Sequence, residues 1–491
     1  MTTGHKIARN LLPLSGTVRE VMARLNEGVG GVVLFTDNDG VLRGVATDGD
    51  IRRAILNGCN LDTPAADFMI RKFTSGHADA DPTQNLALLS ARIRHLPILD
   101  SAGRPVDLLT WADLWRMPLV QPSLGGNESK YVNDCLATGW ISSQGPYIEK
   151  FQNAFAAYMG GGRAFCTSSG TTALHLALEA LGIGAGDEVI VPDFTFGATA
   201  NVVLHANATP IFVDVDPITW TLDPKAMEAA ITSRTKAVIP VHLYGHPCDM
   251  DPIMALAREH GLKVIEDCAE ALGAEYKGRK VGLIGDVGCF SFFANKVITT
   301  GEGGMVLTNS SELAATMAML RDHGMAPGRR YWHLAAGYNY RMTNLQAAVG
   351  LAQLERIDVF LDRRAELVKR YNGYLAGFAG LQLPTQAPWA RNIYWLYSLA
   401  VCPEHLGMNR DQLAARLQER GIETRPVFHP LHDQPAYRTG IAHPCPVTAD
   451  IAARGLSLPT GNEMTGAEVD RVCDALTSIM RTQQVYRAQP A

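Results

Sequence analysis

Short apolar runs alternate with amphipathic stretches after residue 160. Four apolar runs predict strands: EVIVP (188–192), PIFVDV (210–215), KAVIPV (236–241) and KVIED (263–267). Helices are predicted over 172–182 and 252–261, and each of them ends at a glycine or next to one. Such alternation predicts an α/β domain in which helices cover both faces of a mostly parallel sheet.

The front of the chain carries a different pattern, and it occurs twice, in residues 30–54 and 92–116. Each segment has an apolar strand, a polar turn with glycine, a second apolar strand, and then T-x-x-D opening a helix. The matching pairs are Thr47 with Asp50 and Thr110 with Asp113. One T-x-x-D is typical of a helix N-terminus with an acid in its first turn. The duplication after matching strands indicates an internal repeat.

This repeat resembles a tandem CBS pair over residues 12–118. The resemblance implies that its threonines and aspartates hold the phosphate and ribose of an adenine nucleotide. The second copy has Val106 where the first is matched at Gly44, and we expect the valine to weaken binding there. A linker is expected near 116–124, where two prolines and two glycines disfavour helix.

Composition narrows the class of protein. The chain has 491 residues, a net charge of −5 and 47% hydrophobic residues, which is typical of soluble proteins with two to four domains. The weak acidity does not favour nucleic-acid binding. The nine cysteines form no CxxC pair and indicate reduced thiols. We expect no secretory signal and no membrane span, and therefore a cytoplasmic protein.

Ligands of mostly parallel sheets bind beyond the carboxyl ends of the strands, so the residues that follow the predicted strands are candidates for a binding site. CTSSGTTALHLAL (166–178) places serines, threonines and a glycine at the mouth of a helix, which is a possible anion site. Phe196 follows the strand EVIVP. Asp267 ends the strand KVIED, where a carboxylate is costly unless it is paired. It could cap the next helix or meet a cationic ring nitrogen.

Lys296 lies between Phe292-Phe293 and a loop with three glycines, in SFFANKVITTGEGGMV. Burial would lower the pKa of this lysine and expose a free amine that can form a Schiff base. A phosphate cradle, a flat group, an acid and such a lysine are together what pyridoxal 5′-phosphate (PLP) requires.

The motifs that carry a family resemblance are SSGTTALHLAL, EVIVPDFTF, VIEDCAEALGAEYKG, SFFANKVITTGEGGMV and GYNYRMTNLQAAVGLAQLERID. Over about 120–480 the chain resembles the DegT/DnrJ/EryC1/StrS aminotransferases, which are fold-type I PLP enzymes acting on nucleotide-linked keto sugars. Further motifs resemble the enzymes that aminate C4 of GDP-4-keto-6-deoxy-mannose, although those lack a CBS module. The expected domains are a CBS module (1–118), a PLP-binding domain (119–360) and a small C-terminal α/β domain (361–491).

The resemblance implies a role for each matching residue. Gly170, Thr171 and Ser291 would bind the phosphate. Phe196 would stack on the ring, Asp267 would pair with its nitrogen, and Glu270 would lie near its hydroxyl. Lys296 would carry the cofactor and move protons. Asn339 would reach the cofactor of a partner subunit, which implies at least a homodimer, and His429 and His432 would line the sugar pocket. The amino donor would be L-glutamate.

Several alternatives stay open. C3 and C4 aminotransferases share these motifs, so the sugar is not fixed. A PLP sugar dehydratase is disfavoured because such relatives replace the lysine with histidine. A nucleotide sensor with an inactive enzyme domain is disfavoured by the intact set of Lys296, Asp267 and Ser291. Zinc at His242, His246 and Cys248 is disfavoured because the spacing does not follow a helix face.

Overall fold

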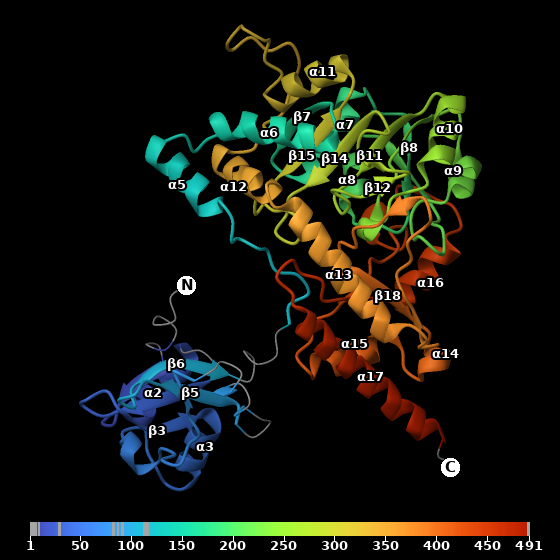
Figure 1. The fold of residues 1–491 in the computed structure, drawn as a ribbon. Coiled ribbons are helices and arrows are strands. Elements are labelled where there is room, and N and C mark those ends of the chain that lie inside the picture. Colours follow the sequence, from blue (N-terminus) through green and yellow to red (C-terminus); the bar gives the residue numbers. More distant parts are fainter. Residues whose placement is uncertain are drawn as a thin grey trace. The chain divides into compact units, whose positions relative to one another are not determined.

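The computed structural model of this chain describes residues 7, 10–27, 31–80, 84–85, 88–89, 93–110 and 117–488. The chain separates into two compact units, residues 1–116 and 117–491 (Figure 1). The further division expected between 119–360 and 361–491 stays a prediction.

The front unit contains the same strand arrangement twice. The first sheet consists of β1 (Leu11–Pro13), β2 (Val32–Thr36) and β3 (Leu42–Thr47), and the second of β4 (Gly76–His77), β5 (His95–Leu99) and β6 (Pro105–Thr110). In each sheet the middle strand pairs parallel with the first strand and antiparallel with the last. The helices of this unit include α2 (Val18–Glu27), α3 (Asp48–Leu56) and the short η2 (Ala65–Asp67). The repeat seen in the sequence is thus a repeat of structure.

Strand pairing corrects the alignment of the two copies. Phe35 faces Gly44 in the first sheet, and Ile98 faces Asp107 in the second. A register irregularity follows immediately in both copies. The counterpart of Gly44 is therefore Asp107, and the match with Val106 was wrong by one residue; the spacing between the Thr47 and Thr110 pairs requires Asp107 as well.

Gly44 has a packing role in the structure. A Cβ at this position would lie 2.6 Å from Met69 Sδ and 3.2 Å from the Ile70 carbonyl oxygen. The backbone of Val45 forms an antiparallel bridge with Ile70 directly beside it. Only glycine lets the chain approach this closely, so Gly44 brings the segment after η2 against β3.

An eight-stranded sheet forms the centre of the second unit (Figure 1). Its order is β20 (Ile441–Ala442), β9 (Thr209–Val213), β8 (Glu188–Pro192), β10 (Thr235–Val238), β11 (Lys263–Asp267), β14 (Val287–Ser291), β15 (Gly304–Thr308), β7 (Arg163–Thr167). Strand β15 is antiparallel to both of its neighbours, and the other pairs are parallel. The mostly parallel sheet is thereby confirmed, and β8 and β11 match their predicted bounds residue for residue.

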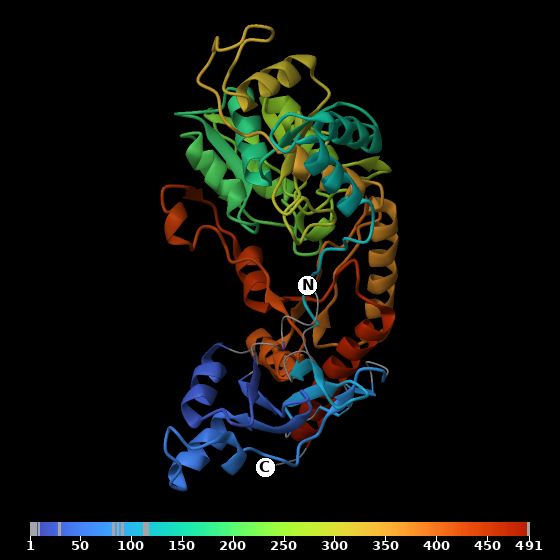
Figure 2. The same ribbon diagram turned by 90° about the vertical axis from the view of Figure 1, so that its left-hand side faces the viewer.

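The central strands are buried on both faces. Val189 and Val191 of β8 belong to one apolar cluster, whereas Ile190 between them belongs to another. This explains why the strands read as continuous apolar runs and not as alternating patterns. The helices around the sheet are α5 (Glu128–Thr138), α6 (Pro146–Met159), α7 (Gly170–Ala180), α8 (Ala198–His205), α9 (Pro224–Ala230), α10 (Met250–His260), α11 (Ser311–Arg321) and α12 (Asn344–Leu354) (Figure 2).

The predicted helices over 172–182 and 252–261 are α7 and α10, and both begin two residues early, at Gly170 and Met250. For α7 the reason is local: the Ser169 side chain accepts a hydrogen bond from the Thr172 N–H at 3.1 Å and caps the helix. The helix therefore starts directly at the carboxyl edge of the sheet.

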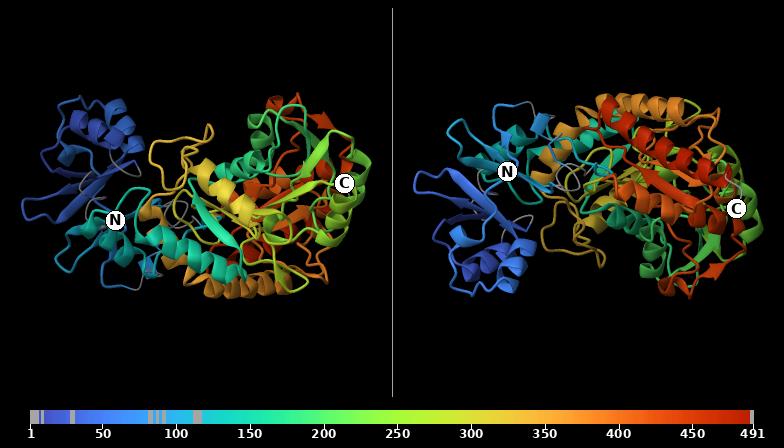
Figure 3. Two further views of the ribbon diagram at one scale, coloured as in Figure 1. Left: turned by 90° about the horizontal axis from the view of Figure 1, so that it is seen from above. Right: turned by 90° about the horizontal axis from the view of Figure 1, so that it is seen from below.

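A smaller antiparallel sheet follows, with the order β16 (Leu381–Gln382), β18 (Tyr397–Val401), β21 (Gly455–Leu458), β19 (Arg425–Pro426). The long helix α13 (Ile357–Leu375) runs from the large sheet to this one and packs along α17 (Gly466–Ala488) (Figure 3). The remaining elements are β12 (Glu275–Tyr276), β13 (Arg279–Lys280), η3 (Leu243–Gly245), β17 (Ala390–Arg391), α14 (Pro403–Leu406), α15 (Arg410–Gln418), η4 (Pro435–Tyr437) and α16 (Pro446–Arg454).

Two expectations from the sequence concern the state of the cysteines and the presence of membrane-spanning helices. All nine cysteines are free thiols. In the described part of the chain, no helix combines the length and the apolar character that a membrane crossing requires.

Candidate active site

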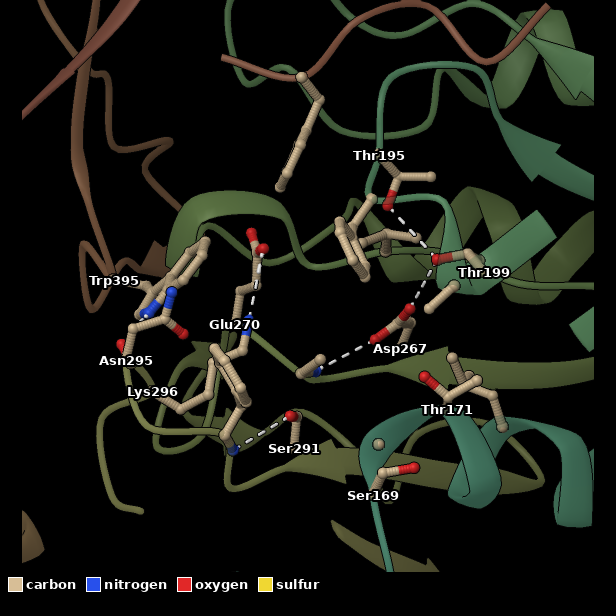
Figure 4. Close-up of a pocket in the computed structure, with 18 of the residues that line it drawn as sticks. Ser169, Thr171, Thr195, Thr199, Asp267, Glu270, Ser291, Asn295, Lys296 and Trp395 are labelled. Atoms are coloured by element: carbon tan, nitrogen blue, oxygen red, sulfur yellow. Dashed lines mark hydrogen bonds and ion pairs between the residues drawn. The ribbon is translucent and has the colours of Figure 1, made fainter. Parts of the chain in front are cut away.

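A cavity of about 370 Å³ lies at the carboxyl ends of β8, β11 and β14 (Figure 4). Its lining comes from the start of α7, the loops after these three strands, and the C-terminal part of the chain. The lining residues include Ser169, Gly170, Thr171, Phe196, Thr199, Asp267, Glu270, Ser291, Asn295, Lys296, Glu302, Trp395, Arg425 and Phe428.

One end of the cavity is the N-terminus of α7. The first N–H groups of a helix have no partner inside the helix, and together with the helix dipole they attract an anion. Gly170 also meets the end of β14, because a Cβ there would lie 2.8 Å from Ser291 Cβ. This close approach brings the Ser291 hydroxyl to the helix start beside Ser169 and Thr171. The donor set fits a phosphate group.

Asp267 forms the floor of the cavity at the end of β11. Its side chain is only 4% exposed and accepts hydrogen bonds from Thr199 Oγ1 at 2.9 Å and from the Ala269 N–H at 3.1 Å (Figure 4). Burial raises the pKa of Asp267 above its ordinary value, and these two donors oppose that rise only in part. A buried carboxylate in this state favours a cationic partner such as a protonated ring nitrogen.

Lys296 and Glu270 form an ion pair, with Lys296 Nζ 3.6 Å from Glu270 Oε1. Burial lowers the pKa of Lys296, with Glu270 and Asp267 opposing it, so the free amine is favoured. Burial likewise raises the pKa of Glu270 to about 7, although Lys296 opposes the rise and the Tyr244 N–H donates to its carboxylate at 2.9 Å. Glu270 is therefore close to changing charge at neutral pH.

Aromatic rings form the walls around this pair. Lys296 Nζ lies 3.8 Å from the centre of the Trp395 ring, and the Trp395 indole N–H donates to the Asn295 carbonyl oxygen at 2.7 Å. The Tyr244 ring stacks with the rings of Trp395 and Phe428, in each case at an interplanar angle of 10°. These contacts hold the lysine in a mostly apolar surrounding, which is what lowers its pKa.

Phe196 lies at the entrance of the cavity. Its side chain is 62% exposed, and its ring centre is 6.0 Å from that of Phe428. An exposed ring that lines the same cavity as the buried Asp267 is available to cover a planar ligand whose nitrogen meets the carboxylate.

The structure brings together seven residues singled out in the sequence: Gly170, Thr171, Phe196, Asp267, Glu270, Ser291 and Lys296. Asn339, His429 and His432 are not among the residues that line the described cavity. Asn339 is exposed and accepts from Arg341 Nε at 3.3 Å. His432 is held by the buried Asp193, with its Nδ1 2.7 Å from Asp193 Oδ2.

The lining residues that sequence reasoning missed include Thr199, Glu302, Trp395, Arg425 and Phe428. Thr199 carried a weak signal, because it follows DFTF by three residues, in the first turn of α8. Trp395, Arg425 and Phe428 lie about 100 residues or more beyond Lys296 and come from the smaller sheet and its connections. Arg425 and Phe428 lie close to His429, which the resemblance placed in the sugar pocket, whereas nothing in the local sequence of Trp395 points to the cavity.

The histidines considered for zinc make other contacts. His246 Nε2 accepts from the Ala387 N–H at 3.1 Å, and its Nδ1 lies 2.7 Å from the Pro247 carbonyl oxygen. His242 Nδ1 accepts from the Cys248 N–H at 2.9 Å, which leaves Nε2 to donate to the buried Glu266 at 3.1 Å. These ring nitrogens therefore serve the protein's own hydrogen bonds.

In the front unit, the Thr47 N–H and hydroxyl donate to Asp50 at 2.8 and 2.7 Å, and Arg53 forms an ion pair with the same carboxylate. The cap at the start of α3 thus uses both residues of the first pair. In the second pair Thr110 is buried at the end of β6, while Asp113 lies outside the described residues.

The fold and the cavity together define the class of protein, a PLP-dependent transferase. The model of the DegT/DnrJ/EryC1/StrS aminotransferase family matches residues 122–477, and a CBS domain model matches residues 11–57. The chain belongs to the DegT/DnrJ/EryC1/StrS aminotransferase family, with a CBS domain at its N-terminus.

Individual relatives support this assignment. GDP-perosamine synthase of Caulobacter vibrioides is 50% identical over 370 residues, which are 75% of this chain and 100% of the relative. The enzyme of the same name from Escherichia coli O157:H7 is 46% identical and covers 73% of this chain and 97% of its own length. Among solved structures, DesV of S. venezuelae has a TM-score of 0.67 and 39% identity, covering 72% of this chain and 94% of its own. A sugar aminotransferase of Streptococcus pneumoniae in a PLP form has a TM-score of 0.71 at 29% identity, covering 75% and 99%.

These findings confirm the expected activity class and cofactor: the chain is a PLP-dependent sugar aminotransferase. The residues of the cavity fit that cofactor. The start of α7 with Ser291 suits its phosphate, Asp267 its ring nitrogen, and Lys296 its aldehyde carbon.

Proposed function

We propose that this enzyme transfers the amino group of L-glutamate to the C4 ketone of GDP-4-keto-6-deoxy-mannose, with GDP-perosamine as the product. The observation that carries the proposal is the placement of Lys296, Glu270 and Asp267 in one cavity, in a chain half identical to a GDP-perosamine synthase over that enzyme's whole length. A nucleotide-linked keto sugar with C3 as the acceptor carbon is the alternative.

The bound cofactor supplies the electron sink that stabilises a carbanion at the reacting carbon. The protein supplies position and protons. Lys296, with its lowered pKa, is the base that removes the proton from Cα of the amino donor and returns it at the other end of the transfer. Asp267 holds the ring nitrogen in its protonated state, because it offers a buried negative charge at that atom.

Glu270 assists Lys296 in the transfer of protons. It lies 3.6 Å from Lys296 Nζ, and its pKa of about 7 lets it accept or release a proton near neutrality. Trp395 and Phe428 exclude water from the pair, so that protons move between the lysine and the substrate and not to solvent.

The test is a panel of acceptors. Purified enzyme with L-glutamate is offered GDP-, UDP- and dTDP-linked 3-keto and 4-keto sugars, and products are identified by mass spectrometry. We expect amination of the GDP-linked 4-keto sugar and no product with Lys296→Ala. Amination of a 3-keto or a dTDP-linked sugar in preference would overturn the proposed substrate, and no amination of any sugar would overturn the proposed reaction.

We also propose that the active enzyme is at least a homodimer in which Asn339 acts at the cofactor site of the partner subunit. The support is the match of GYNYRMT to the family motif, together with the exposed position of Asn339 outside its own cavity. Light scattering of the holoenzyme tests the oligomeric state, and a monomer with full activity would exclude a shared site.

A second candidate function belongs to the front unit, which we propose binds an adenine nucleotide. The duplicated strands and the buried Thr110 at the position equivalent to Thr47 support it. Calorimetry with AMP, ADP and ATP tests it, using Asp50→Ala and, as a matched control on the same helix, Asp48→Ala. Since Asp50 also caps α3, the fold of both variants is checked by circular dichroism. No heat of binding with any of the three nucleotides would reject the proposal.

A further inference from the structure

Arg425 is a lining residue without an assigned role. It lies on β19, where its backbone is paired with Ser457 of β21, so the sheet fixes the position of its Cα. Its side chain lines the cavity and is 52% exposed. Within the described residues its guanidinium makes only a loose ion pair, with Nη2 3.9 Å from Glu423 Oε1. A guanidinium held at one edge of a substrate cavity with most of its donors free is available for a ligand.

The charged residues that line the cavity indicate which kind of ligand Arg425 can bind. Three acids line it, Asp267, Glu270 and Glu302, against two cations, Lys296 and Arg425. The amine of Lys296 is committed to the cofactor, and burial lowers its pKa. Arg425 is thus the one permanent cation among the described lining residues, because arginine keeps its proton at every relevant pH.

We propose that Arg425 binds a carboxylate of the amino-acid donor, an inference that rests on the transamination proposed above. An amino acid must enter a cavity that already holds three carboxyl groups, so a carboxylate on it needs a fixed cation. Arginine suits this task because its planar fork gives two parallel hydrogen bonds to one carboxylate, which fix the orientation as well as the affinity. The donor's amino group is thereby directed to the cofactor carbon beside Lys296.

The surroundings strengthen such an ion pair. Phe428, three residues further along the chain, and Trp395 line the same cavity. Apolar rings lower the local dielectric, and an ion pair there is screened less than on an open surface. The partial exposure of Arg425 leaves it accessible to a donor arriving from solvent.

The two half-reactions separate this role from binding of the acceptor's diphosphate. In the first, PLP enzyme is mixed with L-glutamate alone and the change in cofactor absorbance is followed. In the second, enzyme in the amino form is mixed with the keto sugar alone. Arg425→Gln should raise the glutamate concentration for half-maximal rate about tenfold or more, since a lost charged hydrogen bond costs about 1.5–3 kcal/mol. The second half-reaction should change less than about threefold.

Two matched variants complete the series. Arg425→Lys keeps the charge without the fork and should recover part of the affinity. Arg258→Gln removes an exposed arginine on α10, outside the cavity, and should behave as wild type. L-Alanine as donor distinguishes the two carboxylates: a loss with both donors assigns the α-carboxylate to Arg425, and a loss with glutamate alone assigns the γ-carboxylate.

Calorimetry gives a readout independent of turnover. Glutarate, a dicarboxylate without an amine, should bind wild-type holoenzyme and bind Arg425→Gln about tenfold more weakly. Unchanged glutarate binding together with an unchanged glutamate half-reaction would overturn the inference, and so would a loss confined to the sugar half-reaction or shared equally by both. If wild-type enzyme gives no half-reaction with any amino acid, the proposed function fails, and this result is distinct from the failure of Arg425.

Discussion

We expect the substitution Asp267→Asn to affect the enzyme differently with and without its cofactor. The substitution is isosteric and exchanges a carboxylate for an amide at a position that is 4% exposed. The hydrogen bonds of the Asp267 side chain can be kept in the variant. The amide oxygen still accepts from the Ala269 N–H, and the amide nitrogen can donate to Thr199 Oγ1, which can turn toward Thr195 Oγ1 at 3.4 Å. The variant should therefore fold, and only the charge is lost.

The expected effects have opposite signs. In the cofactor-free protein, burial raises the pKa of Asp267 because its charge is poorly compensated, so removing the charge should raise the Tm at pH 7–8. In the holoenzyme, the charged hydrogen bond to the ring nitrogen is lost. Such a bond contributes about 1.5–3 kcal/mol, which corresponds to a fall in rate of about tenfold to 150-fold.

The assay is the single-turnover reaction of holoenzyme with saturating L-glutamate, together with the Tm of the cofactor-free protein by calorimetry. Asp223→Asn is the matched control, because Asp223 accepts from the Lys225 N–H at 2.9 Å and caps α9 away from the cavity. A fall in rate of less than about tenfold, corresponding to roughly 1.4 kcal/mol, would refute the role at the ring nitrogen. A lowered Tm of the cofactor-free variant would refute the argument from burial.

Lys296→Ala should remove transamination and the visible absorbance of covalently bound cofactor while Lys263→Ala, an exposed lysine on β11, leaves both unchanged; near wild-type turnover would overturn the assignment of Lys296. In cofactor-free protein, Glu270→Gln should change the pH dependence of Tm. Burial raises the pKa of Glu270 from 4.5 to about 7, so its stabilising effect is fully present below about 4.5 and is lost as pH rises through about 7. Wild type should therefore lose more Tm than the variant between about pH 5 and pH 8, and equal losses would contradict this. Mixing inactive Lys296→Ala with inactive Asn339→Asp should restore some activity in hybrid dimers, and no recovery after confirmed subunit exchange would count against a shared site.

The sequence by itself determined the architecture of the large sheet and one half of the cavity. Strands buried on both faces must be apolar throughout, and such runs stand out, so β8 and β11 were found residue for residue. The chemistry follows those runs directly: Asp267 is the last residue of its strand, and the helix start with Gly170 follows β7 after two residues. A polar residue directly after an apolar strand can be recognised from the local sequence alone, and these residues were found in that way.

The rest was decided by tertiary structure. Trp395, Arg425 and Phe428 reach the cavity only because the smaller sheet folds back onto the carboxyl edge of the large one. The raised pKa of Glu270 and the lowered pKa of Lys296 likewise come from burial, which no single residue reveals in the sequence. In the front unit, strand pairing places the two copies in the same register, with Phe35 facing Gly44 and Ile98 facing Asp107. Register depends on hydrogen bonds between strands, and these form only when distant segments meet.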